Sequence, residues 1–328
     1  MINKFFKKTA FLTAFPFFVW TGYWTVSAYA IEHGISLAIE YPKVSATEVQ
    51  FEMASVVGYP QDFSVGFSDI VIGNKGSFKW ATKEVNLEAK SYLPNKINLD
   101  ISEPHSISGP FGSIEVDANV ANLVILFQPN FQLSLGNLDG LFENIILSPS
   151  GLPDTKIDTV SARVEASQSD KTSYSLSAEI KGFDLSDILV DLESNYQYIS
   201  NISFIAEVGL THPIDRYVLY DAAPKVKVLT LQEALINYGS TSITINGELA
   251  VNDSEKLDGN FTLKVQGWDK LFNLAKNVGF INPDLEDFFY KVLSDIAKQD
   301  GSENTLHLPL NVKNNTVSYG VLTLGVLP

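Results

Sequence analysis

The chain has 328 residues, a formal net charge of −15 and no cysteine. A strongly negative charge disfavours binding to nucleic acid, whose phosphates are recognised by clustered Lys and Arg. The lack of cysteine excludes disulfides, a thiolate nucleophile and cysteine-based metal sites. With 45% hydrophobic and 19% charged residues, the composition is that of a folded globular protein.

The beginning of the chain predicts a membrane anchor. Lys4, Lys7 and Lys8 precede an uncharged run over residues 9–31. As a helix this run measures about 35 Å, enough to cross a hydrocarbon core of about 30 Å. Basic residues stay cytoplasmic. We therefore expect a single-pass protein of the cell inner membrane, with the C-terminal bulk in the periplasm and the bilayer as a partner through the anchor.

The end of this run carries two further signals. Trp20, Tyr23 and Trp24 predict an aromatic belt at the far membrane interface. Ala28-Tyr29-Ala30 has the small-x-small pattern of a signal-peptide cleavage site, and cleavage near Ala30 would give a secreted or periplasmic protein instead. The hydrophobic part is longer than a usual signal-peptide core, which favours the uncleaved anchor.

After residue 41 the hydrophobic period changes from helical to two. Short alternating segments follow one another with turn residues between them, and further strands are expected at residues 113–120, 130–135 and 173–180. Closely spaced strands imply antiparallel pairing. The predicted fold class is α+β, mainly β, with long antiparallel curved sheets, a few amphipathic helices and one N-terminal transmembrane helix.

Four helices are expected in the β-rich part, over residues 183–192, 229–238, 270–277 and 283–298. The last is the clearest, because hydrophobic residues line one face, Pro283 suits the first turn and Asn282 suits the N-cap. The order of strands and helices predicts three parts: the anchor and a short amphipathic extension (1–40), a first β-rich half (41–182) and a second β-rich half with helices (183–328).

Several short motifs resemble one known family. Gly22-Tyr23-Trp24, Val57-Gly58-Tyr59-Pro60, Ser91-Tyr92-Leu93-Pro94-Asn95 and Leu308-Pro309-Leu310 occur in this order along the chain. Together they resemble the alphaproteobacterial domain-of-unknown-function family numbered 2125. The resemblance implies an inner-membrane-anchored protein facing the periplasm, with no catalytic activity attached. The chain differs from the family in its few arginines.

A looser likeness is to AsmA-like lipid-transfer proteins, which combine an N-terminal anchor, long antiparallel strands and amphipathic helices. Their curved sheets hold acyl chains in an apolar groove. This is a likeness of architecture, and architecture alone does not establish function.

Signals for catalysis are missing from the sequence. The four histidines, His33, His105, His212 and His307, are scattered, and none has a partner at metal-binding spacing. No nucleophile elbow or phosphate-binding glycine loop is present. We expect a protein that is not an enzyme, with no catalytic residues, metal or cofactor.

The aromatic and aliphatic residues of the strands and of the last helix allow two interpretations. They fill an ordinary core, or they line a groove for a phospholipid or fatty-acyl ligand, closed by residues 283–298 as a lid that opens at the membrane. The predicted function is lipid binding or handling in the envelope; the alternative is a non-enzymatic scaffold or assembly factor with a fully packed sheet. The candidate groove and lid residues are Phe63, Phe67, Trp80, Leu285, Phe288, Phe289 and Val292.

Overall fold

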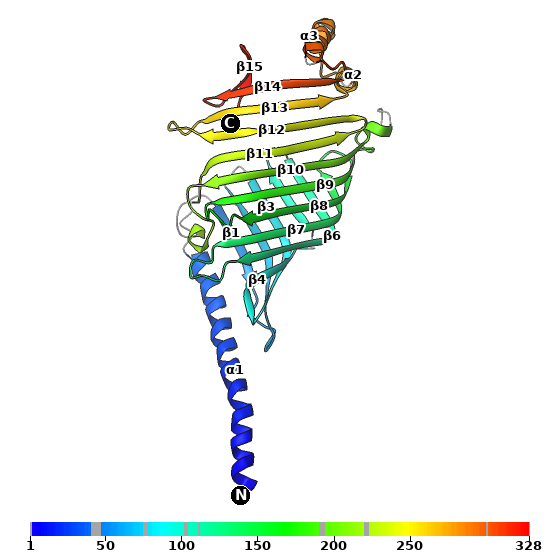
Figure 1. Ribbon diagram of the computed structural model, residues 1–328. Coiled ribbons are helices and arrows are strands. Elements are labelled where there is room, and N and C mark those ends of the chain that lie inside the picture. The colour runs from blue at the N-terminus through cyan, green and yellow to red at the C-terminus, as the bar shows by residue number, and fades with distance from the viewer. Residues whose placement is uncertain are drawn as a thin grey trace. The chain divides into compact units, whose positions relative to one another are not determined.

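The computed structural model describes residues 2–40, 47–74, 78–101, 104–110, 112–189, 194–219, 223–277, 279–299 and 301–327. The contacts group the chain into two compact units (Figure 1). Unit 1 comprises residues 1–117, 121–136 and 215–223, and unit 2 comprises residues 118–120, 137–214 and 224–328. Each unit is described by itself.

Unit 1 is a sheet with one long helix. Its strands pair in the order β1-β2-β3-β4-β6, and β5 pairs with β3 and β6. The pairing is antiparallel, and β3 is long enough to pair first with β5 and then with β4. The elements are α1 (Ile2–Glu40), β1 (Thr47–Met53), β2 (Asp62–Asn74), β3 (Phe78–Lys90), β4 (Leu93–Asp100), β5 (His105–Gly109), β6 (Gly112–Phe127) and the 3-10 helix η2 (Arg216–Leu219).

Unit 2 is an antiparallel meander in which each strand pairs with the next along the chain. Figure 1 shows β8 to β14 following one another in this order. The strands are β7 (Leu135–Pro149), β8 (Thr155–Ala166), β9 (Ser173–Asp184), β10 (Tyr198–Leu210), β11 (Val226–Tyr238), β12 (Thr241–Val251), β13 (Leu257–Gln266), β14 (Thr305–Lys313), β15 (Thr316–Tyr319) and β16 (Leu322–Val326). The helices are α2 (Trp268–Asn277), α3 (Glu286–Gln299) and the short 3-10 helices η1 (Ser194–Tyr196) and η3 (Pro283–Leu285).

The predicted fold class is confirmed in its main point, since the described residues form sixteen strands and three α-helices. Asn282 is the N-cap of η3, and its side chain accepts a hydrogen bond from the Asp284 N–H. No helix in the described part of the chain combines the length and hydropathy needed to cross a membrane. The side chains of residues 2–15, which include the lysines and the first part of the predicted span, lie outside the described residues.

Three predicted elements are wrong. Residues 229–238 belong to β11 and form no helix. At 183–192, β9 runs to Asp184, whose carboxylate accepts the Ser186 N–H and starts a turn; residues 190–193 lie outside the described residues. Residues 130–134 form a loop, in which Leu133 has a positive φ of 49°, and β7 begins only at Leu135.

The core of unit 2 lies where its two α-helices meet the sheet. Trp268 and Phe272 of α2 and Ala297 of α3 are buried against Val265 and Leu306 of the strands. The Trp268 indole N–H donates to the Glu303 carbonyl, 3.0 Å away. The helices thereby cover the corner of the sheet where β13 ends and β14 begins.

Candidate functional site

One face of the unit 2 sheet is apolar across its central strands. The registers bring Ala162 of β8, Ala178 of β9 and Phe204 of β10 into one row, because Ala162 pairs with Ala178 and Ala178 with Phe204. The rows on either side also consist of hydrophobic residues, because every second residue of each strand points to this face. We call this set the apolar face: Val160, Ala162, Val164, Leu176, Ala178, Ile180, Ile202, Phe204, Ala206, Leu231, Ala234 and Ile236.

The opposite face of the same strands is mostly polar. It carries mainly hydroxyl, amide and charged side chains, together with Ile205 and Leu235. A β-bulge in β11 preserves this separation: Ala206 pairs with Leu231 but Ile205 pairs with Glu233. Gln232 and Glu233 are both exposed, and Gln232 hydrogen-bonds Glu207 across the strands. The extra residue is therefore accommodated on the polar side.

The apolar face is only half-buried. Apart from Ala206, which is buried, its residues all keep an intermediate exposure. The apolar row continues into β12 and β13 through Ile245 and Leu263. Helices α2 and α3 pack at Val265 and Leu306, beyond the apolar face as defined. An uncharged sheet face of this extent can bind an apolar ligand by removing it from water.

The predicted lid residues lie on the outer side of α3, except Leu285, which ends the preceding 3-10 helix η3. Leu293 and Ile296 pack on the helix and sheet core with the buried Ala297. Leu285, Phe289 and Val292 are exposed, and Phe288 is 63% exposed. The hydrophobic stripe predicted over residues 283–298 is therefore divided. Leu293 and Ile296, near its C-terminal end, pack on the sheet, whereas the residues nearer its N-terminal end are exposed to solvent.

Two of the predicted groove residues, Phe63 and Phe67, pack in unit 1 with α1. Phe63 is 1% exposed, and its ring stacks on Trp24 with ring centroids 5.6 Å apart. Ala28 of α1 is buried in the same cluster, and Phe67 packs beside it. The site is a closed contact between a helix and a strand. We call it the clamp.

The clamp is also fixed by hydrogen bonds from ring atoms to backbone. The Trp20 and Trp24 indole N–H groups donate to the carbonyls of Pro60 and Asp62 at 3.0 and 2.9 Å. The Tyr23 hydroxyl donates to the Ser91 carbonyl at 2.9 Å.

One further bond has its donor in the loop and its acceptor on α1: the Val56 N–H donates to the Glu32 carboxylate at 2.8 Å. Each bond aligns one part of α1 with a loop of unit 1, so the helix has a defined position on that unit.

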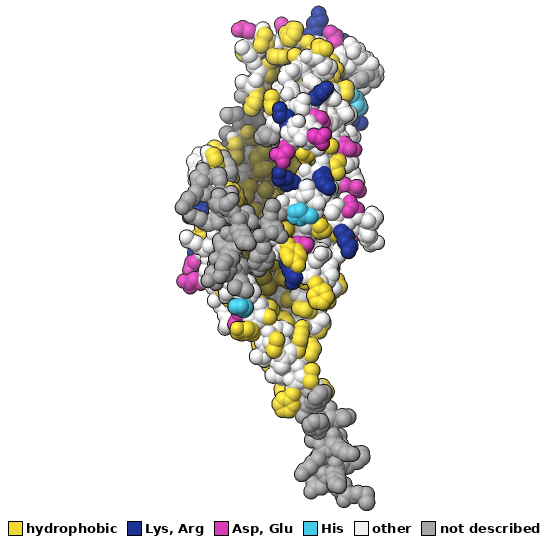
Figure 2. Space-filling view, turned by 90° about the vertical axis from the view of Figure 1, so that its left-hand side faces the viewer, with side chains coloured by type: hydrophobic (Ala, Val, Ile, Leu, Met, Phe, Trp, Pro, Cys, Tyr) yellow, Lys and Arg dark blue, Asp and Glu magenta, His cyan; other side chains and the backbone are white. Residues whose placement is uncertain are grey.

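The outward side of α1 is apolar. Phe17, Phe18 and Val19 are all more than half exposed. In Figure 2 the surface just above the lower grey segment is yellow and white, without the colours of charged side chains. The described start of α1 therefore presents an uncharged surface to its surroundings.

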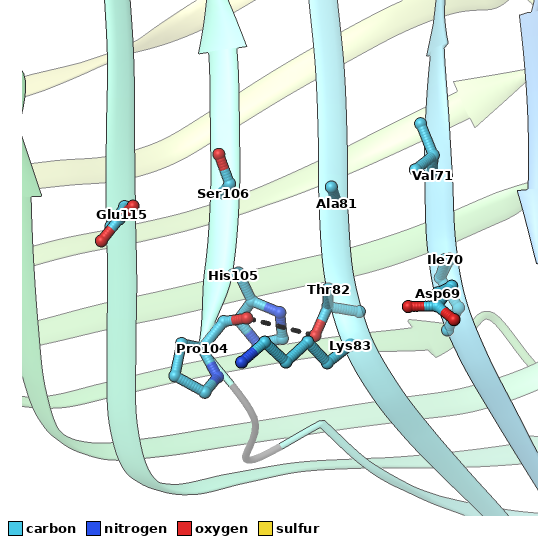
Figure 3. A pocket seen from close by; sticks show the side chains of 10 residues that line it. All are labelled: Asp69, Ile70, Val71, Ala81, Thr82, Lys83, Pro104, His105, Ser106 and Glu115. Atoms are coloured by element: carbon cyan, nitrogen blue, oxygen red, sulfur yellow. Dashed lines mark hydrogen bonds between the residues drawn. The ribbon is translucent and has the colours of Figure 1, made fainter.

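The third predicted groove residue, Trp80, lies beside a hollow of about 430 Å³ in unit 1. Its ring is 5.7 Å from that of His105. Figure 3 shows the His105 ring between Pro104 and Thr82, and the Thr82 hydroxyl donates to the Pro104 carbonyl at 3.3 Å.

His105 is buried, and neither ring nitrogen has a hydrogen-bond partner among the described residues. Burial lowers the pKa of His105, although the Ile101 carbonyl and Asp117 partly oppose this. His105 is therefore a neutral ring packed in the wall of the hollow. No cluster of three or more metal-ligating side chains occurs in the part of the chain that the structure describes.

The residues of the apolar face were not among the sequence candidates. Their signal is present in β9, where Tyr174, Leu176, Ala178 and Ile180 alternate with serines and Glu179. The pattern predicts a strand with two different faces but not how many neighbouring strands share the same apolar side. That extent depends on the registers.

The fold and these sites define a β-rich protein of two units, with an aromatic helix clamp on one and a one-sided apolar sheet on the other. The family model described as "Uncharacterized protein conserved in bacteria (DUF2125)" matches residues 24–328. The chain belongs to this family, which confirms the resemblance. A search of curated proteins and a search of solved structures found no match.

Proposed function

We propose that this protein is tethered to the inner membrane, faces the periplasm and binds lipid acyl chains on the apolar face of unit 2. The observation that carries the proposal is the half-buried, uncharged state of that face across four strands, opposite a mainly polar face. A strand that only closed a core would bury its apolar side chains more completely.

The dimensions of the sheet suit an acyl chain. Strands β7 to β14 follow one another in the meander. At about 4.8 Å per strand, the apolar row from β8 to β13 extends for about 24 Å, and a single bilayer leaflet has a hydrocarbon thickness of about 15 Å. Fully burying one aliphatic side chain contributes about 1.5–3 kcal/mol. Several half-buried side chains acting together are sufficient to hold one acyl chain.

The tether supports the same proposal. The lysines and the uncharged run favour a helix anchored in the bilayer. Because Trp20, Trp24 and Ala28 pack on unit 1, we assign the membrane-embedded part of this helix to the residues that precede Trp20. The clamp then joins that helix firmly to unit 1 through Phe63 and the loop at Pro60. A protein held in this way remains beside a source of lipid.

The proposal is for binding and not for a reaction. The apolar face has no hydroxyl, carboxylate or imidazole group among its residues that could act as a nucleophile or as a general acid or base. Its side chains offer dispersion and burial, which distinguish an apolar ligand from a polar one but do not activate a bond.

Native mass spectrometry of the purified full-length protein tests the proposal. We expect phospholipid to remain bound after the detergent is removed in the spectrometer. Phe204→Gln should lose it, because a polar group then interrupts the apolar face. Ser203→Gln is the matched control: it places the same side chain on the opposite face of β10, and it should retain lipid. Equal lipid in both variants, or none in the wild type, would exclude the apolar face as the site.

One observation favours the scaffold alternative. Strand β16 pairs with β15 through one edge, and Leu322, Leu324 and Val326 are exposed. An exposed apolar edge strand can pair with a strand of another protein. Deleting residues 322–328 should abolish copurification of a partner protein under the scaffold alternative, and should leave lipid binding unchanged under the main proposal.

A further inference from the structure

Four segments of unit 1 are linked in series by hydrogen bonds at one end of its sheet. The Tyr23 hydroxyl of α1 donates to Ser91 in the β3–β4 turn. Just after this turn, at the start of β4, the Asn95 side chain donates to the Phe127 carbonyl at the end of β6, 2.8 Å away. The loop after β6 then accepts the Arg216 N–H of η2 at the Gln132 carbonyl, 3.1 Å away. The four segments, residues 16–23, 91–96, 128–134 and 215–218, thus adjoin one another, and we call the surface that they form the rim.

Each segment exposes aromatic or aliphatic side chains on this rim. Phe131 is 94% exposed and Tyr92 is 71% exposed, while Leu93 and Tyr217 are also exposed. The described start of α1 adds the exposed side chains of Phe17, Phe18 and Val19. Single exposed hydrophobic residues are common on protein surfaces, but several that gather on adjoining segments mark a contact with a membrane or another protein.

The rim is also depleted of acidic residues. Residues 16–23, 91–96, 128–134 and 215–218 contain one carboxylate, Asp215, and two cations, Lys96 and Arg216. The chain as a whole has 38 acidic and 23 basic residues. Asp215 accepts the Tyr217 N–H, and the Arg216 guanidinium lies over the Tyr217 ring, 5.1 Å from its centroid. Cations therefore outnumber carboxylates on the rim, whereas carboxylates outnumber cations in the whole protein.

From this arrangement we propose that the rim is a membrane-contact surface, which rests on the headgroup region of the bilayer and inserts Phe131 and Tyr92. Aromatic rings with cationic neighbours are the side chains that a bilayer interface favours, and anionic headgroups attract the two cations. The start of α1 belongs to the rim, so a bilayer that holds this helix adjoins the loop tips. The inference goes beyond acyl-chain binding by unit 2 and does not depend on it.

The absence of cysteine makes a direct test practical, because one introduced cysteine gives a single labelling site. Phe131→Cys and Tyr92→Cys in the full-length protein are labelled with an environment-sensitive fluorophore. Each protein is reconstituted into phosphatidylethanolamine and phosphatidylglycerol vesicles, with or without phospholipid brominated near the headgroup. Glu115→Cys is the control, since Glu115 is exposed on β6 and lies about 40 Å along that strand from Phe127.

We expect the labels at positions 131 and 92 to shift to the blue and to lose emission when the lipid is brominated, while the label at 115 does neither. Emission at 131 and 92 that matches the emission at 115 would overturn the proposal. A blue shift without quenching by brominated lipid would also overturn it, because the rim would then contact protein. The outcome is independent of lipid retention by the Phe204 and Ser203 variants.

Discussion

The clamp of unit 1 and the apolar face of unit 2 are both hydrophobic, but they differ in how completely they are covered. In the clamp, Phe63 is 1% exposed and the indole N–H groups of Trp20 and Trp24 bond to backbone carbonyls. On the apolar face, Phe204 keeps an intermediate exposure, and its neighbours are aliphatic side chains without hydrogen-bonding groups.

This difference separates a structural contact from a surface suited to binding. A closed aromatic cluster with bonded polar atoms leaves no apolar area to gain by adding a ligand. A half-covered aliphatic sheet retains that area, and the hydrophobic free energy scales with it. Substitutions in the clamp should therefore change stability, whereas substitutions on the apolar face should change lipid binding first.

The largest expected effect is that of Phe63→Ala. Removing a fully buried ring leaves a cavity beside Trp24 and should lower the free energy of unfolding by about 3–5 kcal/mol. Urea unfolding of the wild type and the variant measures the difference. Phe78→Ala removes the same ring from an exposed position on β3 and should stay within about 0.5 kcal/mol. Similar losses for both variants would mean that the clamp is not a specific contact.

The next effect concerns the tether. Phe17→Arg places a charge within the uncharged run and should cost about 3 kcal/mol of insertion free energy. A reporter that is active only outside the cytoplasm, fused after Pro328, should lose activity in this variant. Phe17→Leu should keep it. A soluble chain that starts at Ile31 would instead show that the segment is a cleaved signal peptide.

A smaller effect is expected for Ser91→Ala. The Ser91 hydroxyl is fully buried and lies 2.7 Å from the Gln61 carbonyl and 3.0 Å from the Pro60 carbonyl. Without it, the Pro60 carbonyl keeps the Trp20 indole N–H and the Gln61 carbonyl keeps the Ser91 N–H as donors, so the loss is that of ordinary hydrogen bonds, about 0.5–1.5 kcal/mol. Ser254→Ala, in an exposed turn, is the control and should leave the unfolding midpoint unchanged. An unchanged midpoint for Ser91→Ala would show that water replaces the hydroxyl.

The smallest effect is the pH dependence due to His105. Its pKa in the folded protein is lowered from the ordinary value of 6.5, mainly by burial. Well above pH 6.5, His105 is neutral in both the folded and the unfolded state, and it contributes nothing to the pH dependence of stability. As the pH falls below it, the unfolded chain binds the proton first, so stability decreases. His105→Phe should reduce the loss of stability between about pH 7 and about pH 5; an equal loss in both proteins would exclude His105 as the cause.

The sequence allowed the antiparallel β architecture and the helix after Asn282 to be predicted, because alternation and capping are local signals. β11 was missed for a physical reason. Its bulge places Leu229, Leu231, Ala234 and Ile236 on one side, and the three-residue step after Leu231 imitates a helical spacing.

The candidate site was harder to predict than the fold. Phe63 alternates like a sheet residue, but its partner is Trp24, which precedes it by 39 residues and belongs to the uncharged run at the start of the chain. The apolar face needs four strands in register before it exists, and no single strand reveals its width. Both the clamp and the apolar face therefore depend on contacts between residues far apart in the sequence, which local patterns do not reveal.

The most direct test of lipid binding by unit 2 is photocrosslinking in membranes. A benzophenone amino acid is placed at position 204 on the apolar face or at position 203 on the opposite face of β10. After illumination, mass spectrometry of the full-length protein should show an added phospholipid at position 204 and none at position 203. Crosslinks of equal yield at both positions, or no lipid adduct at position 204, would contradict lipid binding on the apolar face.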